Sequence, residues 1–557
     1  MTTPIPTSEG VAALSSEAPD GLPDSATLAR WANEFFSTVG ATAPVAPAPL
    51  PKGPSLSAAP SLSATPSLPD IGALGSAIQA GRSALARSSS QDFVHPELPS
   101  VPMFRSAVPS GIQQSPPAWP TSSPDLAPSF YFLETAIPAN AAARTAAHPA
   151  FNVEAIRKDF PILQERVHGR PLVWFDNAAT TQKPLAVIER LSQFYRHENS
   201  NIHRAAHELA ARSTDAYEGA RRQVQRFLGA ASAGEIVFVR GATEAINLVA
   251  QTWGRKNIGP GDEILISYLE HHANIVPWQM LAAERGAVIR VVPVDSKGQL
   301  RLDEYQRLLN SRTKLVSITH VSNALGTVTP VKDIVDLGHR AGACVLIDGA
   351  QSVSHIPIDV QALDADLFVL SGHKVFGPTG IGVLYGKAKV LESMPPWQGG
   401  GNMIEDVTFE GTRYQPPPSR FEAGTGNIAD AVGLGAALEY LTTIGMPNIE
   451  HYESQLLQYA TEQVSKVPGL EIIGTATHKA SVLSFVIAGV EPTAIGSALN
   501  QEGIAVRAGH HCAQPIVRRF GLEATVRASF AFYNTCAEID AMTAVLQGVA
   551  ASSGRRA

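Results

Sequence analysis

The chain has 557 residues, a formal net charge of −7 and only 17% charged residues, and no long basic block occurs in it, so nucleic-acid binding is a poor expectation. Its three cysteines form no CxxC pair, which excludes a disulfide framework and suits a reducing, cytoplasmic compartment. No stretch approaches the roughly 18 consecutive apolar residues of a membrane-spanning helix.

The first 150 residues differ in composition from the rest. They hold 23 of the 41 prolines, and from residue 41 to residue 128 the chain is mostly Pro, Ser and Ala. Such a segment cannot bury enough apolar surface to offset the entropy of ordering, so residues 1–150 are predicted to be disordered. The start also lacks the basic and apolar regions of a signal peptide.

Two short segments interrupt this composition. In residues 25–38, Leu28, Trp31 and Phe35 fall on one face of a predicted helix, and residues 130–133 form the apolar cluster FYFL. One interpretation is that the helix folds back onto the rest of the chain. The other is that it docks in a groove of another protein, with the proline-rich stretch as a tether.

Residues 151–557 alternate apolar runs with amphipathic stretches, which predicts an α/β fold with a mainly parallel sheet. Strands are expected at 235–239, 262–267, 314–318, 343–347 and 366–370. After the first strand, small residues and Thr243 open a helix. A helix N-terminus of this kind is a candidate anion site, although an ordinary strand–helix turn would look the same.

Two charged residues follow later strands. Asp348 comes directly after residues 343–347, and Lys374 lies in the sequence SGHKVFGPTG after residues 366–370. A lysine buried among apolar groups loses its proton readily and becomes an amine nucleophile. The pair suits a pyridoxal phosphate site, with the amine forming a Schiff base and the carboxylate holding the pyridine nitrogen protonated. The alternative for Asp348 is an ordinary helix cap.

The last cluster is Arg507, His510, His511 and Cys512, with Arg527 nearby in sequence. Three adjacent ligands cannot surround a tetrahedral ion, so no metal is expected here. A cysteine beside histidines and arginines is predicted to have a lowered thiol pKa and to act as a nucleophile, and the arginines suit a substrate carboxylate. Cys344, within a predicted strand, is interpreted as a core residue, and Cys536 is uninformative.

With these residues assembled, residues 151–550 resemble the fold-type I cysteine desulfurases, specifically the group II, SufS-like branch. The resemblance rests on the sequences FDNAATTQKP, NIHRAAHELA, EHHANIVPWQ, HVSNALGT, DGAQSVSH, SGHKVFGPTGIG, FEAGTGN and RAGHHCAQP. It implies a class V aminotransferase-like large domain over 151–430, which includes an N-terminal segment of the small domain. It also implies a small α+β domain over 431–557 that carries the cysteine loop, and a homodimer.

The resemblance also implies a role for each site residue. Those expected to contact pyridoxal phosphate are Lys374 as the Schiff-base lysine, Asp348 at the ring nitrogen, Gln351 at the ring hydroxyl, His271 stacked on the ring, Thr243, Ser371 and His373 at the phosphate, and Thr425 from the partner subunit. Those expected around the substrate are Asn323 and Arg527 at its carboxylate, and Arg507 and His203 lining the pocket.

The implied reaction converts L-cysteine to L-alanine, leaves a persulfide on Cys512, and passes the sulfur to an acceptor protein. Selenocysteine lyase, cysteine sulfinate desulfinase and aminotransferase are rival activities on the same fold, and an aminotransferase has no use for Cys512. A further alternative is a binding or scaffolding protein whose enzyme domain is vestigial. The intact set of Lys374, Asp348, His271 and Cys512 argues against it.

The N-terminal segment has a resemblance of its own. SATLARWANEFFS and FYFLE look like the targeting elements of cysteine desulfurases packaged inside family 2 encapsulin shells, which place a long Pro/Ala/Ser-rich segment before the enzyme. The implied partner of residues 1–150 is an encapsulin shell protein, and the implied location is the interior of the nanocompartment. The alternative is a generic partner-binding linker.

Overall fold

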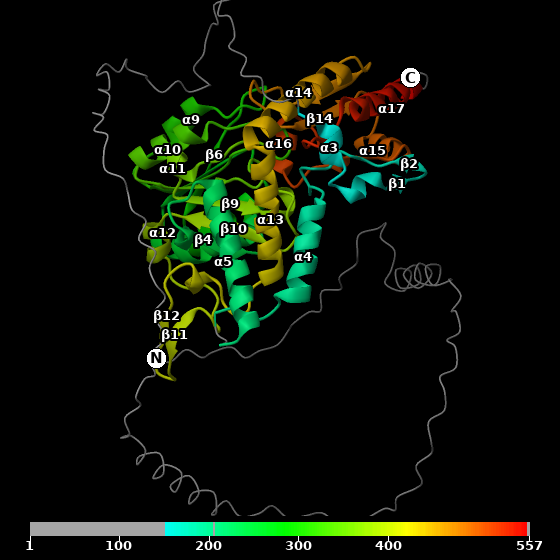
Figure 1. The fold of residues 1–557 in the computed structure, drawn as a ribbon. Helices are drawn as coiled ribbons and strands as arrows, with labels where there is room; N and C mark the ends of the chain where they lie inside the picture. Colours follow the sequence, from blue (N-terminus) through cyan, green and yellow to red (C-terminus); the bar gives the residue numbers. More distant parts are fainter. Residues whose placement is uncertain (1–150, 204–205, 554–557) are drawn as a thin grey trace, which may run out of the picture. The chain divides into compact units, whose positions relative to one another are not determined.

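The computed structural model of the protein describes residues 151–203 and 206–553. The predicted disorder of residues 1–150, the helix at 25–38 and the cluster at 130–133 lie outside the described residues. The described part has two lobes, a larger one built on a central sheet and a smaller one that contains the C-terminal helix (Figure 1). No helix in this part is long and apolar enough to cross a membrane.

The larger lobe is built on a seven-stranded sheet with the order β4-β10-β9-β8-β7-β5-β6. Only β10 runs antiparallel to its neighbours β4 and β9; the other adjacent pairs are parallel. The strands are β4 (Ile236–Val239), β5 (Glu263–Ser267), β6 (Val288–Val292), β7 (Thr313–Thr319), β8 (Cys344–Asp348), β9 (Leu367–Ser371) and β10 (Gly382–Gly386). The mainly parallel α/β sheet predicted from the sequence is confirmed, and the five expected strands correspond to β4, β5, β7, β8 and β9.

Side chains of successive strand residues enter two different cores, because they point to opposite faces of the sheet. In β8, Val345 and Ile347 belong to one core, and Leu346 belongs to the other. Helices α4 (Leu185–His197), α5 (Glu208–Leu228), α10 (Val331–Arg340) and α13 (Ile428–Ile444) cover the first face, and α6 (Ala242–Val249) and α8 (Val276–Arg285) cover the second. A strand buried on both faces must be apolar throughout, which explains the continuous apolar runs in the sequence.

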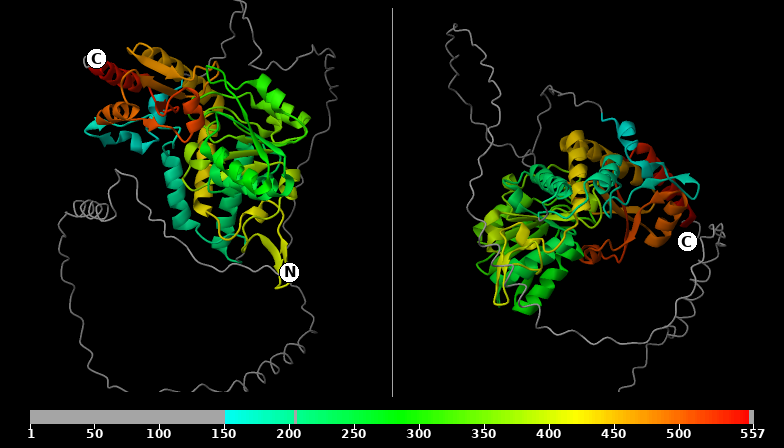
Figure 2. Two further views of the ribbon diagram at one scale, coloured as in Figure 1. Left: turned by 180° about the vertical axis from the view of Figure 1, so that it is seen from behind. Right: turned by 60° about the horizontal axis from the view of Figure 1, so that its bottom comes forward.

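The helices of this lobe connect the strands and enclose the sheet (Figure 2). They are α4 (Leu185–His197), α5 (Glu208–Leu228), α6 (Ala242–Val249), α7 (Arg255–Asn257), α8 (Val276–Arg285), α9 (Leu302–Leu308), α10 (Val331–Arg340), α11 (Val360–Leu363), α12 (Ala388–Ser393) and α13 (Ile428–Ile444). A π-helical turn, η4 (Ala250–Gly254), joins α6 to α7, and β11 (Ile404–Val407) pairs with β12 (Thr412–Tyr414) in a hairpin. The shorter 3-10 turns are η3 (Ala233–Glu235), η5 (His272–Asn274), η6 (Gly372–Lys374) and η7 (Ser419–Phe421).

The smaller lobe combines an antiparallel sheet with helices. Its four strands, in the order β13-β14-β17-β16, are β13 (Leu470–Ile473), β14 (Val482–Ile487), β17 (Thr525–Ser529) and β16 (Arg507–Gly509). Its helices are α3 (Val153–Arg157), η2 (Pro161–Gln164), α14 (Met446–Val464), α15 (Pro492–Gln501), α16 (Gln514–Arg519) and α17 (Cys536–Ser553). Two further pairs are β1 (Arg166–Val167) with β2 (Arg170–Pro171), and β3 (Val173–Trp174) in parallel with β15 (Ile504–Ala505).

Strand β3 thus pairs with β15 across more than three hundred residues of sequence. This pairing places the N-terminal segment of the described chain beside the smaller lobe. The division at residues 430–431 stays a prediction. By packing, α13 lies against α4 and α5, so the chain passes from one lobe to the other at Gly445, between α13 and α14.

A buried ion pair ties α5 to the end of the loop that precedes α13. Arg221 Nη1 lies 2.7 Å from Glu422 Oε1, and Arg221 Nη2 donates to Glu422 Oε2 at 2.9 Å. Glu422 also accepts from the Phe238 N–H at 2.8 Å and from the Tyr217 hydroxyl at 2.9 Å. Both charged side chains are almost fully buried; Glu422 depends on Arg221 for compensation of its charge, and Arg221 has a further carboxylate partner, the partly exposed Glu218.

Replacing Glu422 by Gln is expected to destabilise the protein by about 3 kcal/mol, because it leaves the buried Arg221 charge with only the partly exposed carboxylate of Glu218 among the described residues. The control is Glu284→Gln, which breaks the exposed pair with Arg255 and is expected to change little. Chemical denaturation followed by circular dichroism measures both. Equal stability of the two variants would contradict the prediction.

Candidate functional site

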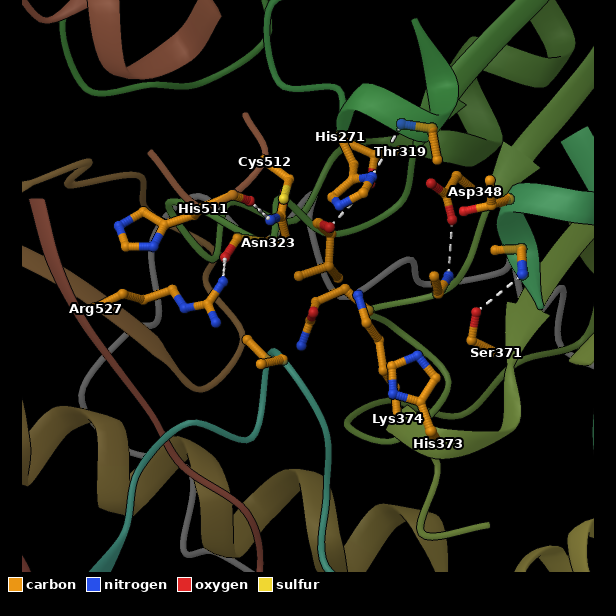
Figure 3. A pocket seen from close by; sticks show the side chains of 18 of the residues that line it. His271, Thr319, Asn323, Asp348, Ser371, His373, Lys374, His511, Cys512 and Arg527 are labelled. Carbon is orange, nitrogen blue, oxygen red and sulfur yellow. Dashed lines mark hydrogen bonds between the residues drawn. The ribbon is translucent and has the colours of Figure 1, made fainter. Parts of the chain in front are cut away.

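The candidate site lies at the edge of the large sheet where strands β4, β5, β7, β8 and β9 end. Parallel strands bring their carboxyl ends to one edge, and there the segments after them meet the smaller lobe. A cavity of about 180 Å³ opens at this position (Figure 3). Predicted site residues that line it are Thr243, His271, Asn323, Asp348, Gln351, Ser371, His373, Lys374, Arg507, Cys512 and Arg527.

The floor of the cavity carries the amine and the carboxylate singled out in the sequence. Lys374 ends η6, directly after β9, and Asp348 is the last residue of β8. Burial lowers the pKa of Lys374 to about 8, against the opposing effect of Asp348. Burial also raises the pKa of Asp348, while the Ala350 N–H, which donates to its Oδ1 at 2.9 Å, acts to lower it. The arrangement supplies a reactive amine and a buried acceptor in one cavity.

Helix α6 begins at the cavity and forms the candidate anion site. The Ala242 N–H donates to Ser371 Oγ at 2.9 Å, and Thr243 follows in the first helical turn. Burial, aided by Lys374, lowers the pKa of His373 to about 4, so this imidazole is neutral near pH 7. A hydroxyl pair and a neutral ring at a helix N-terminus can donate to an anion without adding a buried charge.

His271 covers the cavity from the segment after β5. The Ala273 N–H donates to its Nδ1 at 3.0 Å, so in the neutral ring the proton is on Nε2. Burial, with a contribution from Lys374, lowers the pKa of this imidazole to about 3. The segment is held by Glu270, whose buried carboxylate accepts from Ser267, Asn274 and the Thr319 N–H. The sequence interpretation quoted Glu270 within a motif but assigned it no role.

Cys512 lies on a loop of the smaller lobe that follows β16. His511 and Cys512 both have φ of 55°, in the left-handed region that costs a non-glycine residue about 1–3 kcal/mol. Two contacts with the larger lobe hold this conformation: the His272 N–H donates to the Cys512 carbonyl at 2.8 Å, and Asn323 Nδ2 donates to the His511 carbonyl at 2.6 Å. The thiol is partly exposed and faces the cavity.

The other two cysteines have no place at this site. Cys344 is the first residue of β8 and packs against the second core, in agreement with its interpretation as a core residue. Cys536 is exposed at the start of α17. Among residues 151–203 and 206–553, no group of three potential ligands could hold a metal ion.

Two arginines approach the cavity from neighbouring strands, β16 and β17, where Arg507 and Arg527 are register partners. The fully buried Arg527 donates to the Asn323 carbonyl at 2.9 Å and to Asp176 at 2.8 Å, and Arg507 Nε lies 3.4 Å from the same carboxylate. Asp176 thus positions both cations. It was missed as a site residue, although it stands in the quoted sequence FDNAATTQKP, because its partners are more than three hundred residues away.

Two predicted site residues lie elsewhere in the same chain. Thr425 is exposed in a hollow bordered by Arg240 and Glu244, and the prediction placed it at the site of a partner subunit. His203 borders a different hollow, where its Nε2 lies 3.1 Å from Glu218. The structure therefore does not bring His203 to the cavity of its own subunit.

The residues around the cavity fit pyridoxal phosphate. Three buried polar atoms at the cavity have no hydrogen-bond partner in the described part of the chain: Gln351 Oε1, Asn323 Oδ1 and Arg527 Nε. Buried polar atoms are normally paired, so these three are available to a bound polar molecule. Asp348 suits a protonated ring nitrogen, Lys374 suits the aldehyde carbon, and the start of α6 suits the phosphate.

Comparison with known proteins agrees with this fit. The Aminotransferase class-V family matches residues 173–542, so the chain belongs to that family and is a pyridoxal phosphate-dependent enzyme. A cysteine desulfurase of Synechococcus elongatus is 61% identical over 487 residues, covering 83% of this chain and 77% of that protein. One from Dickeya dadantii is 50% identical over 400 residues, covering 72% and 97%.

Solved structures give the same answer. The cysteine desulfurase CsdA of Escherichia coli aligns with a TM-score of 0.67 at 40% identity, covering 72% of this chain and 99% of that one. A cysteine desulfurase of Thermococcus onnurineus aligns with a TM-score of 0.69 at 36% identity, covering 72% and 98%. Within the class-V aminotransferases, the chain belongs to the cysteine desulfurase family.

The lowered pKa of Lys374 predicts how cofactor-free protein captures added pyridoxal phosphate. Only the neutral amine attacks the aldehyde, so the capture rate is expected to rise with pH through about 8 and then to level off. Stopped-flow absorbance across pH 6–10 measures it, with Lys374→Arg as the control that captures none. A midpoint near the ordinary lysine value of about 10.4 would contradict the prediction.

Proposed function

We propose that this chain is a group II, SufS-like cysteine desulfurase that converts L-cysteine to L-alanine and passes the sulfur through Cys512 to an acceptor protein. One observation carries the proposal: the Cys512 thiol lines the same cavity as Lys374, Asp348 and Arg527. An aminotransferase needs the amine and the carboxylate but not the thiol. The presence of all of them around one cavity therefore favours sulfur transfer.

The substrate is oriented by the polar groups of the smaller lobe and of the segment after β7. Arg527 and Asn323 bind the carboxylate of L-cysteine, and Arg507 adds positive charge at the mouth of the cavity. Asp176 holds both arginines in place. The substrate's Cα then lies over the cavity floor and its thiol points toward the Cys512 loop.

Bound pyridoxal phosphate supplies the electron sink for the bond changes at the substrate carbons. Lys374, neutral for a substantial fraction of the time near pH 8, takes the proton from Cα and returns it. Asp348 holds a proton at the ring nitrogen, and Gln351 contacts the ring hydroxyl. His271 stacks on the ring and excludes water, and Thr243, Ser371 and His373 anchor the phosphate.

Cys512 carries out the sulfur transfer. Its thiolate attacks the sulfur of the substrate, so that an S–S bond forms while the bond between Cβ and sulfur breaks. The electron pair of the broken bond stays with the three-carbon fragment, which takes up protons and leaves as alanine. A second thiol, from the acceptor protein, then removes the outer sulfur from Cys512.

We further propose that the enzyme acts as a homodimer in which Thr425 completes the phosphate site of the partner subunit. The supporting observation is its exposure next to Glu422, on a loop held by the buried pair with Arg221. His203 is exposed as well and lies near the same pair, since Glu218 contacts both His203 and Arg221. It therefore belongs with this surface rather than with the cavity of its own chain.

Residues 1–150 are proposed to load the enzyme into an encapsulin shell in the cytoplasm. The match to the Synechococcus elongatus protein covers more of the chain than residues 151–557 contain, so the similarity extends into this segment. The Dickeya dadantii match covers only 72% of the chain. Residues 151–557 are long enough to contain a match of that length. The two comparisons support a function of the segment that is separate from catalysis.

Replacing Cys512 by Ala is expected to preserve the bound cofactor and its yellow colour, but to lower alanine production from L-cysteine at least about a hundredfold, because the nucleophile is lost. Alanine is measured with a reductant present. Cys536→Ala, at an exposed site outside the cavity, is the matched control and should be fully active. Equal alanine from Cys512→Ala and the wild type would favour direct lyase chemistry instead.

Deleting residues 1–150 is expected to leave the rate of alanine production unchanged and to abolish loading into a co-expressed encapsulin shell. Co-purification of enzyme with assembled shells measures loading. A deletion of residues 45–120 keeps both the helical segment at 25–38 and the cluster at 130–133, and should load. Normal loading of the protein that lacks residues 1–150 would refute the targeting proposal.

A further inference from the structure

The carboxamide of Gln351 has two polar ends in different surroundings. The side chain lines the cavity, and its Nε2 lies 3.3 Å from Nε2 of His355, which sits behind it and away from the cavity. Its Oε1 is buried and has no partner among the described residues. The protonation of His355 Nε2 therefore determines whether the oxygen or the NH₂ group of the Gln351 amide faces the cavity.

His355 is in turn bound by an acid from the other lobe. Its Nδ1 lies 2.6 Å from Oε2 of Glu453 on α14, and the Ser481 hydroxyl donates to the same oxygen at 3.1 Å. Gln351, His355 and Glu453 are each at most 3% exposed. The three side chains thus form a buried chain of contacts from the cavity to the smaller lobe.

The proton positions in this chain follow from what each atom can do. A carboxylate only accepts, so the proton shared with Glu453 is on Nδ1 of His355. The amide NH₂ of Gln351 can only donate, and it lies 3.3 Å from the other ring nitrogen, so Nε2 is the acceptor in this contact. With its nitrogen engaged, Gln351 presents its oxygen to the cavity. One additional proton on the His355–Glu453 pair would reverse the orientation of the amide. Nε2 of His355 would then carry a hydrogen and donate it to the amide oxygen of Gln351, so the NH₂ group would face the cavity.

The groups around the pair act on Glu453 in both directions. Ser481 and the Phe532 backbone supply hydrogen bonds to Glu453, and His355 is its one cationic or potentially cationic contact among the described residues. Burial raises the pKa of Glu453, and these contacts act in the opposite direction. Glu450, on the same helix, is close enough to have its own pKa raised by Glu453. On the cavity side, Gln351 faces Asp348 and Lys374.

We propose that His355 and Glu453 are positioning residues that hold the Gln351 carboxamide with its oxygen toward the ring hydroxyl of bound pyridoxal phosphate. The inference rests on the proposed contact of Gln351 with that hydroxyl. An amide oxygen accepts from a hydroxyl and favours its protonated form, whereas an amide NH₂ favours the deprotonated oxygen. The smaller lobe thereby influences the protonation of the cofactor without touching it.

The experiment measures the absorbance of the bound cofactor against pH in the holoenzyme, without substrate. Glu453→Gln keeps the size of the side chain but can donate or accept, so the orientation of Gln351 is no longer imposed. The pH midpoint of the spectral change is expected to fall by about half a unit or more, the size of one hydrogen bond to a titrating oxygen. His355→Gln is the second variant, in case Glu453→Gln does not fold, and is expected to lower the midpoint likewise.

The control and the double variant separate the possible failures. Glu538→Gln removes another buried acid of the smaller lobe, one paired with Arg157 and away from the cavity, and should leave the midpoint unchanged. The single variant Gln351→Ala should lower the midpoint. Adding Glu453→Gln to Gln351→Ala should cause no further shift. An unchanged midpoint in Gln351→Ala would overturn the proposed role of Gln351. Two results would overturn the inference. One is a shifted midpoint in Gln351→Ala together with an unchanged midpoint in Glu453→Gln. The other is a double variant in which Glu453→Gln shifts the midpoint as much as it does when Gln351 is present.

Discussion

The arrangement of this enzyme depends on one constraint, the common direction of five strands in the large sheet. Strands β4, β5, β7, β8 and β9 all end at one edge, so the segments that follow them must meet there. Asp348, Lys374, His271 and Thr243 come from four of these ends, at positions spread over more than a hundred residues. The apolar residues that bury the strands on both faces therefore also position the polar residues of the cavity.

Burial then sets the charge of each group in the cavity. The same loss of water that lowers the pKa of Lys374 to about 8 lowers that of His271 to about 3 and raises that of Asp348. The imidazole of His271 is therefore neutral near pH 7, and the amine of Lys374 loses its proton near pH 8, far more readily than an exposed lysine does. Arg527, which burial cannot neutralise in practice, is compensated instead by the carboxylate of Asp176.

The smaller lobe contributes the groups that distinguish sulfur transfer from other reactions of this fold. The loop with Cys512 adopts two consecutive left-handed residues, and hydrogen bonds from His272 and Asn323 of the larger lobe hold it there. The contact of Glu453 with His355 runs between the same two lobes. Contacts between the lobes therefore support both the position of the thiol and the surroundings of the cofactor.

The sequence by itself determined the α/β class and the five strands that end at the site, because continuous apolar runs of strand length alternate with amphipathic stretches. It also identified Lys374, Asp348 and Cys512 as candidate reactive residues, since the first two follow apolar strands and the third stands beside histidines and near arginines. Strands β6 and β10 were not among the expected strands, and the antiparallel direction of β10 is set by its pairing with β4 and β9 and not by its own residues.

Only the tertiary structure decided which residues share the cavity. Asp176 contacts Arg527, and Glu453 contacts His355, across 351 and 98 residues of sequence, and no local pattern encodes such pairs. The contact of His203 with Glu218, away from the cavity of its own chain, is likewise not encoded in any local pattern. The local sequence specifies the strands and the residues with reactive side chains. Which charged groups face one another depends on burial and long-range contacts, because these arise only when distant segments pack together.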